Sequence, residues 1–176
     1  MGKRIMLVAG EASGDALGGP LMAALTEQSS EQPEFIGVGG SAMTAEGMAS
    51  LFPISDLSVM GLAEILPRLR LIFRRMKQTE TLARETRPDI IITIDSPGFN
   101  FRLGKRLKYL GIPLVHYVAP TVWAWKPGRA KKIAQFLDHL LVLLPFEPPY
   151  FEIEGLDCTF VGHSAVSHLP GDGPAF

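Results

Sequence analysis

Residues 90–100 read IIITIDSPGFN, and this stretch decides the fold class. Four isoleucines and a threonine predict a strand buried on both faces, because unbroken β-branched runs are typical of central parallel strands. The strand ends in a carboxylate, Asp95, and Ser, Pro and Gly follow at once. This acid is either a turn residue or a functional group at the carboxyl end of a central strand.

Similar apolar runs alternate with helical patterns along the whole chain. We expect six strands, at residues 4–10, 34–40, 89–95, 112–119, 139–144 and 158–162. Helical patterns fill residues 15–28, about 57–87, 101–111 and 128–138. Continuous apolar strands separated by helices indicate an α/β fold with a Rossmann-like parallel sheet and helices on both faces.

Composition narrows the class of protein. The 176 residues suit one full-sized domain, and the formal net charge of −1 gives no reason to expect a nucleic-acid partner. The single cysteine, Cys158, excludes an internal disulfide. No stretch approaches the ~20 apolar residues of a membrane span, and the start does not resemble a signal peptide, so we expect a cytoplasmic protein. A hydrophobic content of 47% nevertheless suggests an exposed apolar surface.

Ligands of open parallel sheets bind at the carboxyl ends of the strands, so the loops there are candidate sites. In GEASGD (10–15), glycines and free N–H groups suit an anion, but a turn capped by Ser13 or Asp15 fits as well. In the loop 118–129, Trp123 and Trp125 either stack on a ligand or close the core. Arg129 faces either a phosphate or solvent.

Segment 57–77 has a basic amphipathic pattern. Its apolar residues recur at helical spacing: Leu62, Leu66, Leu69, Phe73 and Met76. Its cations are Arg68, Arg70, Arg74, Arg75 and Lys77. Such a helix suits an anionic membrane surface, although a helix that packs its stripe on the sheet shows the same pattern. The hydrophobic composition favours peripheral membrane contact.

The histidines do not indicate a hydrolase. His116 alternates within a strand and is expected to be structural, and no histidine forms a recognisable triad with a serine and an aspartate. The GxSxG motif of hydrolases is absent from the sequence.

Seven motifs together resemble the amino-terminal half of lipid-A-disaccharide synthase. In order along residues 5 to about 163 they are GEASGD, GVGGSAM, VMGLAEIL, IDSPGFN, YVAPTVWAWKPGR, LPFE and FVGH. The resemblance implies an inverting glycosyltransferase of GT-B architecture, with two Rossmann-like domains across a cleft and without a metal or cofactor. The implied reaction transfers 2,3-diacylglucosamine from its UDP form to 2,3-diacylglucosamine 1-phosphate, at the inner-membrane surface.

The resemblance also assigns roles to residues. Asp95 would be the base that takes the proton from the attacking hydroxyl. The acceptor and its neighbours would contact these residues: Glu11, Ser13, Gly14, Asp15, Met60, Asn100, Trp123, Trp125, Arg129 and Glu147. Segment 57–76 would receive acyl chains and touch the membrane.

The sequence departs from the family pattern after the last strand. Ser164 stands where the family usually has proline, and residues 164–176 resemble a linker. We therefore expect residues 1–163 to form the acceptor-side domain, with the donor-binding domain absent and no useful transfer by this chain alone. The alternatives are another sugar-nucleotide enzyme of this architecture, such as a murein glycosyltransferase or an epimerase, and a non-catalytic lipid- or nucleotide-binding module.

Overall fold

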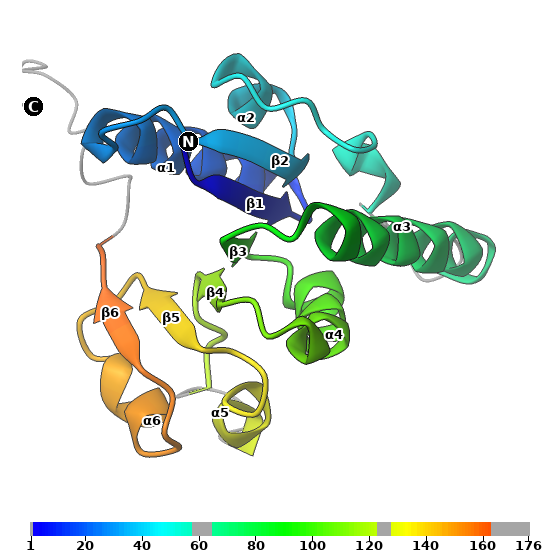
Figure 1. Cartoon of the computed structure of the whole chain (residues 1–176). Helices are drawn as coiled ribbons and strands as arrows, with labels where there is room; N and C mark the ends of the chain where they lie inside the picture. Colours follow the sequence, from blue (N-terminus) through cyan, green and yellow to red (C-terminus); the bar gives the residue numbers. More distant parts are fainter. Residues whose placement is uncertain (1, 58–64, 123–127, 163–176) are drawn as a thin grey trace, which may run out of the picture.

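The structure is a computed structural model that describes residues 2–57, 65–122 and 128–162, with the backbone alone at 65–67. Six strands form one sheet in the order β2-β1-β3-β4-β5-β6, and every neighbouring pair is parallel (Figure 1). The strands are β1 (Arg4–Ala9), β2 (Glu34–Val38), β3 (Ile90–Ile94), β4 (Leu114–Tyr117), β5 (His139–Val142) and β6 (Cys158–Phe160). Each lies within its expected range, and the α/β prediction is confirmed.

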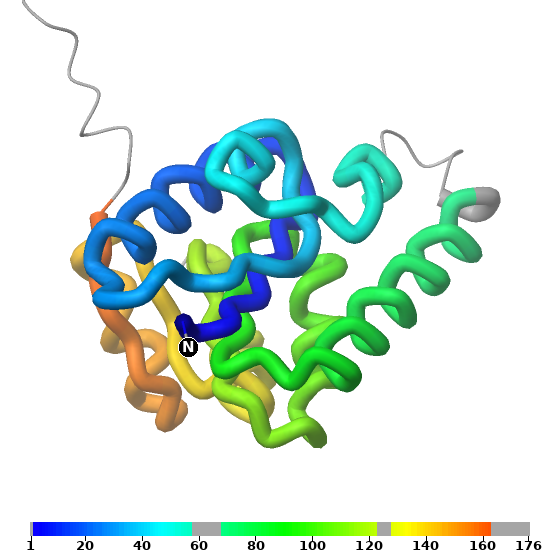
Figure 2. Tube along the Cα trace, turned by 45° about the horizontal axis from the view of Figure 1, so that its top comes forward, coloured from blue at the N-terminus to red at the C-terminus, as the bar shows by residue number. Residues whose placement is uncertain are grey.

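Helices cover both faces of this sheet. They are α1 (Ala12–Gln28), α2 (Ser41–Ala45), α3 (Ile65–Thr86), α4 (Pro97–Leu107), α5 (Gly128–Ile133) and α6 (Pro148–Glu152), with short 3-10 turns η1 (Ile54–Asp56) and η3 (Lys108–Leu110). We call the face that carries α1 and α2 the α1 face, and the face that carries α3 to α6 the α4 face. Figure 2 shows α1 and α3 on opposite sides of the strands.

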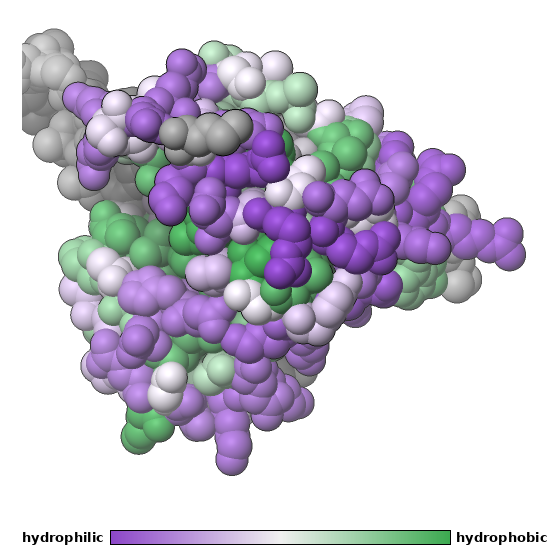
Figure 3. Space-filling model, viewed as in Figure 1, coloured by the Kyte–Doolittle hydropathy of each residue, from purple (hydrophilic) through white to green (hydrophobic). Residues whose placement is uncertain are grey.

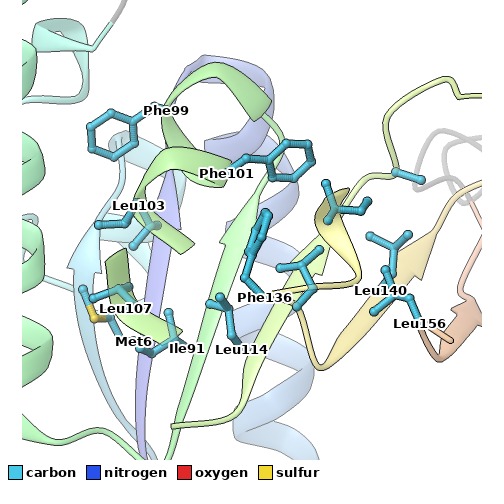
Figure 4. Packing of buried hydrophobic residues seen from close by; sticks show 14 of the residues in the cluster. Met6, Ile91, Phe99, Phe101, Leu103, Leu107, Leu114, Phe136, Leu140 and Leu156 are labelled. Atoms are coloured by element: carbon cyan, nitrogen blue, oxygen red, sulfur yellow. The ribbon is translucent and has the colours of Figure 1, made fainter. Parts of the chain in front are cut away.

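Strand alternation divides the core into two clusters. On the α4 face, side chains of β1, β3, β4 and β5 pack against aromatic and leucine residues of α4 (Figure 4). The labelled members of this cluster include Met6, Ile91, Phe99, Phe101, Leu103, Leu107, Leu114 and Leu140. On the α1 face, Leu7, Ile92 and Ile94 pack with Met22 of α1 and with Met43.

Helix starts differ from the expectations. Helix α4 begins at Pro97 rather than at 101, so the residues after Ser96 are the start of the helix and not a separate turn. Proline suits the first position of a helix, because a backbone N–H there would have no intrahelical partner. Helix α1 begins at Ala12, with Glu11 at the N-cap position and no side-chain cap. The prediction that Ser13 or Asp15 caps this helix is therefore wrong.

The order of the strands fixes where a ligand would bind. From β1 the chain crosses to β2 on one side, and from β3 it continues through β4, β5 and β6 on the other. The carboxyl ends of β1 and β3 therefore flank the topological switch point, where doubly wound sheets open a crevice for ligands.

Candidate functional site

Two loops meet at the switch point. The loop after β1 carries Ser13 at the start of α1, and the end of β3 carries Asp95. The Ser13 hydroxyl donates a hydrogen bond to Oδ2 of Asp95 over 2.9 Å, which joins the two loops at the switch point. Ser13 is exposed and Asp95 is half-buried, so the carboxylate lies at the surface of the sheet edge and not in the core.

The backbone at Asp95 is strained. Asp95 and Ser96 have φ angles of 51° and 46°, which puts two consecutive residues other than glycine in the left-handed region. Such conformations cost roughly 1–3 kcal/mol each and cluster at functional sites, where the surrounding structure holds them. One support is the Asp95 N–H, which donates to the carbonyl of Tyr117 on β4 over 2.9 Å.

Asn100 is a second support of this bend. Its buried Nδ2 donates to the carbonyl oxygens of Val8, Ile94 and Asp95 over 3.3, 3.0 and 2.8 Å. The side chain therefore ties the ends of β1 and β3 to the first turn of α4. Its Oδ1 has no hydrogen-bond partner among the described residues. The structure thus shows Asn100 holding the backbone beneath Asp95.

Gly10 permits the close approach of the two loops. A Cβ atom at this position would lie 2.3 Å from both Cβ and Oγ of Ser96. No pair of heavy atoms tolerates that separation without a shift of the backbone. The glycine of GEASGD is therefore required by the bend at Ser96, a link between two motifs that the sequence does not reveal.

A buried histidine lies next to this bend on the α4 face. His116 of β4 is fully buried, its Nδ1 lies 2.8 Å from the Thr93 hydroxyl, and its ring packs on Phe101 with centroids 4.7 Å apart. Burial lowers the pKa of His116 to about 4, against the opposing influence of the Asp95 carboxylate. The imidazole is therefore neutral at neutral pH, and the prediction of a structural role agrees with its packing. The Arg129 guanidinium lies 5.8 Å from the Phe101 ring centroid.

The second acid of GEASGD has a different environment. Asp15 is 6% exposed, and its two oxygens accept hydrogen bonds from the backbone N–H groups of Gly40, Ala42 and Met43 over 2.7, 3.0 and 3.1 Å. It therefore fixes the start of α2, which follows GVGG. The structure gives Asp15 a structural task.

Glu147, like Asp15, is a buried acid that accepts hydrogen bonds from the backbone. It is 3% exposed, and its Oε2 accepts from the N–H groups of Leu143 and Leu144 over 3.1 and 2.9 Å. These bonds hold the turn between β5 and α6. Two further predicted substrate contacts are described: Glu11 is exposed beside Ser13, and Gly14 is buried against the end of the sheet. Met60, Trp123 and Trp125 lie outside the described residues.

In helix α3, some residues of the basic amphipathic pattern pack on the domain and others are exposed. Met76 is 2% exposed and belongs to the core on the α4 face, so it is not part of a surface stripe. Arg75 donates from Nε to Asp56 over 2.7 Å, and its guanidinium lies 4.8 Å from the ring centroid of Phe52. Both residues are therefore used in packing α3 on the rest of the domain.

The outer side of α3 carries the exposed part of the pattern. Phe73 is 57% exposed, and Arg70, Arg74 and Lys77 are exposed as well, whereas Leu69 is half-buried and Arg68 is partly buried. Leu62 and the side chain of Leu66 lie outside the described residues. A groove of about 360 Å³ runs along this helix, lined by Leu51, Arg74, Lys77, Gln78, Thr81, Leu82 and Glu85. None of the described helices is long and apolar enough to cross a bilayer.

Comparison with solved structures finds the same fold in parts of larger proteins. UDP-GlcNAc 2-epimerase from Neisseria meningitidis superposes with a TM-score of 0.60 at 10% identity, over 87% of this chain and 43% of that chain. MurG from Acinetobacter baumannii gives 0.53 at 16% identity, over 82% and 42%. At these identities the likeness shows the fold alone, that of one half of a GT-B protein.

Comparison of sequences is more specific. A family model described as lipid-A-disaccharide synthetase matches residues 5–173. Lipid-A-disaccharide synthase from Rhodospirillum centenum is 57% identical over 98% of this chain and 44% of the relative, and that from Pseudomonas fluorescens is 49% identical over 95% and 44%. The chain thus spans less than half the length of these relatives, and it corresponds to their amino-terminal part. The chain belongs to the lipid-A-disaccharide synthase family.

Proposed function

We propose that Asp95 is the general base of an inverting glycosyl transfer for which this chain supplies the acceptor side. The Asp95 carboxylate takes the proton from the 6-hydroxyl of 2,3-diacylglucosamine 1-phosphate. The freed oxygen attacks the anomeric carbon of UDP-2,3-diacylglucosamine, and the bond to UDP breaks. The products are the acylated disaccharide 1-phosphate, UDP and a proton carried by the carboxylate.

The position of Asp95 at the switch point carries this proposal. Asp95 is half-buried directly after β3, and its Oδ2 accepts a hydrogen bond from the Ser13 hydroxyl. The acids of the neighbouring loops, Asp15 and Glu147, are buried and accept backbone N–H groups. Of these three carboxylates, Asp95 is the one whose surroundings leave room for a substrate hydroxyl.

Other residues at this edge suit an acceptor with a phosphate and a polar ring. Ser13 fixes the orientation of the Asp95 carboxylate, and the exposed Glu11 next to it is placed for a sugar hydroxyl. Arg129 lies over Phe101 at the start of α5, within the same group of loops, and supplies a cation for the acceptor phosphate. Trp123, Trp125 and Met60 stay proposed substrate contacts on sequence grounds.

The exposed side of α3 is the proposed contact with the cytoplasmic face of the inner membrane and with acyl chains. Phe73 offers an apolar anchor, and Arg70, Arg74 and Lys77 surround it with positive charge, which suits anionic lipid. Flotation with vesicles that contain anionic lipid tests this proposal. Phe73→Glu should reduce the bound fraction. Ile153→Glu is the control, because Ile153 is an exposed apolar residue that directly follows α6, away from α3.

The donor-binding half is proposed to lie in the part of the family members that this chain does not match, after an acceptor-side domain of residues 1–163 and a linker from 164. The chain alone should therefore form no disaccharide at a useful rate. Incubation of the chain with both substrates, followed by detection of UDP, tests this. Turnover close to that of a full-length relative would overturn it.

The role of Asp95 is tested in a protein that contains both halves. Joining this chain to the remaining part of the Rhodospirillum centenum relative supplies the second half in a related context. Asp95→Asn should lower kcat by roughly 10²–10⁴-fold, because general-base catalysis contributes about that much. Asp89→Asn is the matched control, since Asp89 precedes the same strand at its opposite end and accepts the Arg4 N–H.

Two results would contradict this assignment. If Asp95→Asn retained the turnover of the parent protein, Asp95 would not be the base. If the joined protein bound the acceptor but released no UDP, the site would be a binding module and not a transferase.

A further inference from the structure

Two polar residues lie inside the apolar sheet, Thr93 of β3 and His116 of β4, and we call them the polar pair. Figure 3 shows hydrophilic residues, in purple, over much of the outer surface, where water satisfies their polar groups. The polar pair, by contrast, is 1% and 0% exposed. The other residues of the two strands are isoleucine, leucine, valine and tyrosine. Burial of a polar group costs free energy unless hydrogen bonds compensate it, so such a pair is unusual in a core.

The polar pair is bonded across the two strands. Thr93 and His116 are partners in the parallel register, and Nδ1 of the ring lies 2.8 Å from the threonine hydroxyl oxygen. The hydroxyl also donates to the carbonyl oxygen of Val115 over 3.3 Å. Both bonds form together when the ring carries its proton on Nδ1, because the hydroxyl then accepts from the ring and donates to the carbonyl. The ring of Phe101 meets the imidazole edge-on and joins α4 to the pair.

The polar pair lies directly before the point where both strands leave the sheet. The next residues in the register, Ile94 and Tyr117, belong to the core of the α1 face. The residues after them, Asp95 and Val118, have φ angles of 51° and 83°. Positive φ is rare for a valine, because its branched side chain crowds the backbone there. Two neighbouring strands therefore turn into left-handed backbone just beyond the polar pair.

Left-handed backbone of this kind persists only where the surrounding structure holds it. For Asp95, part of that support is the hydrogen bond from its N–H to the carbonyl oxygen of Tyr117, which requires the observed register of β3 and β4. Isoleucines lie on both faces of β3, so its apolar pattern alone does not distinguish one register from the next. The polar pair does, because a slip would leave both groups buried without their partners.

The polar pair is not the most stable filling of this space. Nε2 of His116 is buried and has no hydrogen-bond partner within the described residues, and an unpaired buried nitrogen lowers stability. An apolar side chain would avoid that cost. Burial lowers the pKa of His116 and the Asp95 charge opposes the shift, so the ring and the carboxylate are close. A polar group that costs stability beside a candidate catalytic acid is typical of a functional site.

We propose that the polar pair, Thr93 and His116, positions the Asp95 carboxylate for proton transfer. Neither side chain touches the substrate. Both act through the backbone: they fix the register of β3 on β4, the register fixes the N–H of Asp95 on Tyr117, and that bond holds the bend from which the carboxylate projects. This role rests on the proposed function of Asp95 as the base.

Variants of Thr93 in the joined protein test the proposal. Thr93→Val replaces the hydroxyl by a methyl group and should lower kcat by roughly 10- to 100-fold, because a small misplacement of a reacting group costs up to that much. The KM for the acceptor should stay unchanged, because the substrate contacts remain. Thr93→Ser keeps the hydroxyl and should restore most of kcat. A parent-like kcat in Thr93→Val, or a loss in Thr93→Ser as large as in Thr93→Val, would overturn the proposal.

Thr79→Val is the matched control. Thr79 is as buried as Thr93, and its hydroxyl donates to the carbonyl oxygen of Arg75 within α3 over 2.8 Å. The same substitution at this position should leave both kcat and KM unchanged. An equal loss of kcat in Thr79→Val and Thr93→Val would assign the effect to general stability and would also contradict the proposal.

Hydrogen exchange in this chain gives a readout that does not depend on turnover. The Asp95 amide should exchange faster in Thr93→Val than in the parent chain, because its bond to Tyr117 opens more often. In Thr93→Ser and in Thr79→Val the amide should exchange at the parent rate. Unchanged exchange at Asp95 in Thr93→Val would show that the polar pair does not hold the bend.

Asp95→Asn, measured in the same turnover assay, separates the two proposals. If Asp95→Asn lost turnover while Thr93→Val kept the parent kcat, Asp95 would still be the base and only the role of the polar pair would fail. If both variants kept the parent kcat, the role of Asp95 as base would fail, and the role of the pair with it. A loss in Thr93→Val alone would show that the pair supports another group, which overturns both.

Discussion

Asp15 and Asp95 are acids of two motifs at the same edge of the sheet, and their surroundings differ. Asp15 is 6% exposed, and backbone N–H groups of three residues donate to its carboxylate. Asp95 is half-buried, bonded through one oxygen to a hydroxyl and held on left-handed backbone. The first arrangement stabilises the fold, whereas the second stores strain and leaves the acid accessible, as is usual for functional residues.

This contrast teaches that the number and kind of hydrogen-bond partners separate a structural carboxylate from an available one. The motif GEASGD contains Glu11, Ser13 and Asp15 within five residues, yet their surroundings differ. Glu11 is exposed to solvent, Ser13 donates to Asp95, and Asp15 accepts N–H groups at the start of α2. The comparison predicts that changes at Asp15 affect folding and that changes at Asp95 affect chemistry.

The largest effect on stability is expected at Asp15. Asp15→Ala leaves the N–H groups of Gly40, Ala42 and Met43 without an acceptor, and we expect the free energy of unfolding to fall by about 4 kcal/mol. Urea denaturation measures this change. Glu27→Ala, an exposed position in the same helix, should change stability little. A loss below about 1 kcal/mol at Asp15 would remove the contrast with Asp95.

His116 is expected to make stability depend on pH. Well above pH 6.5 the imidazole is neutral in both the folded and the unfolded chain. As the pH falls from 6.5 toward 4, the imidazole of the unfolded chain binds a proton, whereas the buried imidazole of the folded chain stays neutral. Stability is therefore lost on acidification, by up to roughly 3 kcal/mol from this group. In His116→Gln this part of the acid destabilisation should disappear, whereas His139→Gln should keep it. Identical pH profiles for His116→Gln and the parent chain would show that burial does not hold His116 neutral.

The effect of Asn100 on stability should be smaller than that of Asp15. Asn100→Ala removes the donor to three carbonyl oxygens and should lower the free energy of unfolding by about 2 kcal/mol. Faster hydrogen exchange of the Asp95 amide, which bonds Tyr117, should accompany it. Arg102→Ala, on the exposed side of the same helix, is the control. Unchanged exchange at Asp95 would mean that Asn100 does not hold the bend.

Much of the fold could be predicted from the sequence. The unbroken apolar runs located all six strands, because parallel strands buried on both faces need them. The short helices α2 and α6 cannot be predicted in this way, because five residues each are too few to show a periodic pattern. The predicted start of α4 is too late because Pro97 and Gly98 suggest a turn, although proline is also favoured at the first position of a helix.

The site was predictable in position but not in detail. Strand ends identify the loops at the crevice, and Asp95 follows from that rule. The contacts between motifs do not follow from that rule, because they form only in the folded sheet. They are Ser13 with Asp95, Asp15 with Gly40, and Gly10 with Ser96. Thr93 and His116 are polar residues within apolar strands, and this pattern is a sequence signal for a buried polar pair.

The stability of Asp95→Asn in this chain tests the central claim most directly. Asparagine tolerates the left-handed backbone at φ 51°, and its amide oxygen can still accept the Ser13 hydroxyl. If Asp95 is retained for chemistry, the free energy of unfolding should stay unchanged or rise by about 0.5–1 kcal/mol, as is common when a functional residue is replaced. A fall of more than about 2 kcal/mol would show that Asp95, like Asp15, stabilises the fold, and would contradict the account.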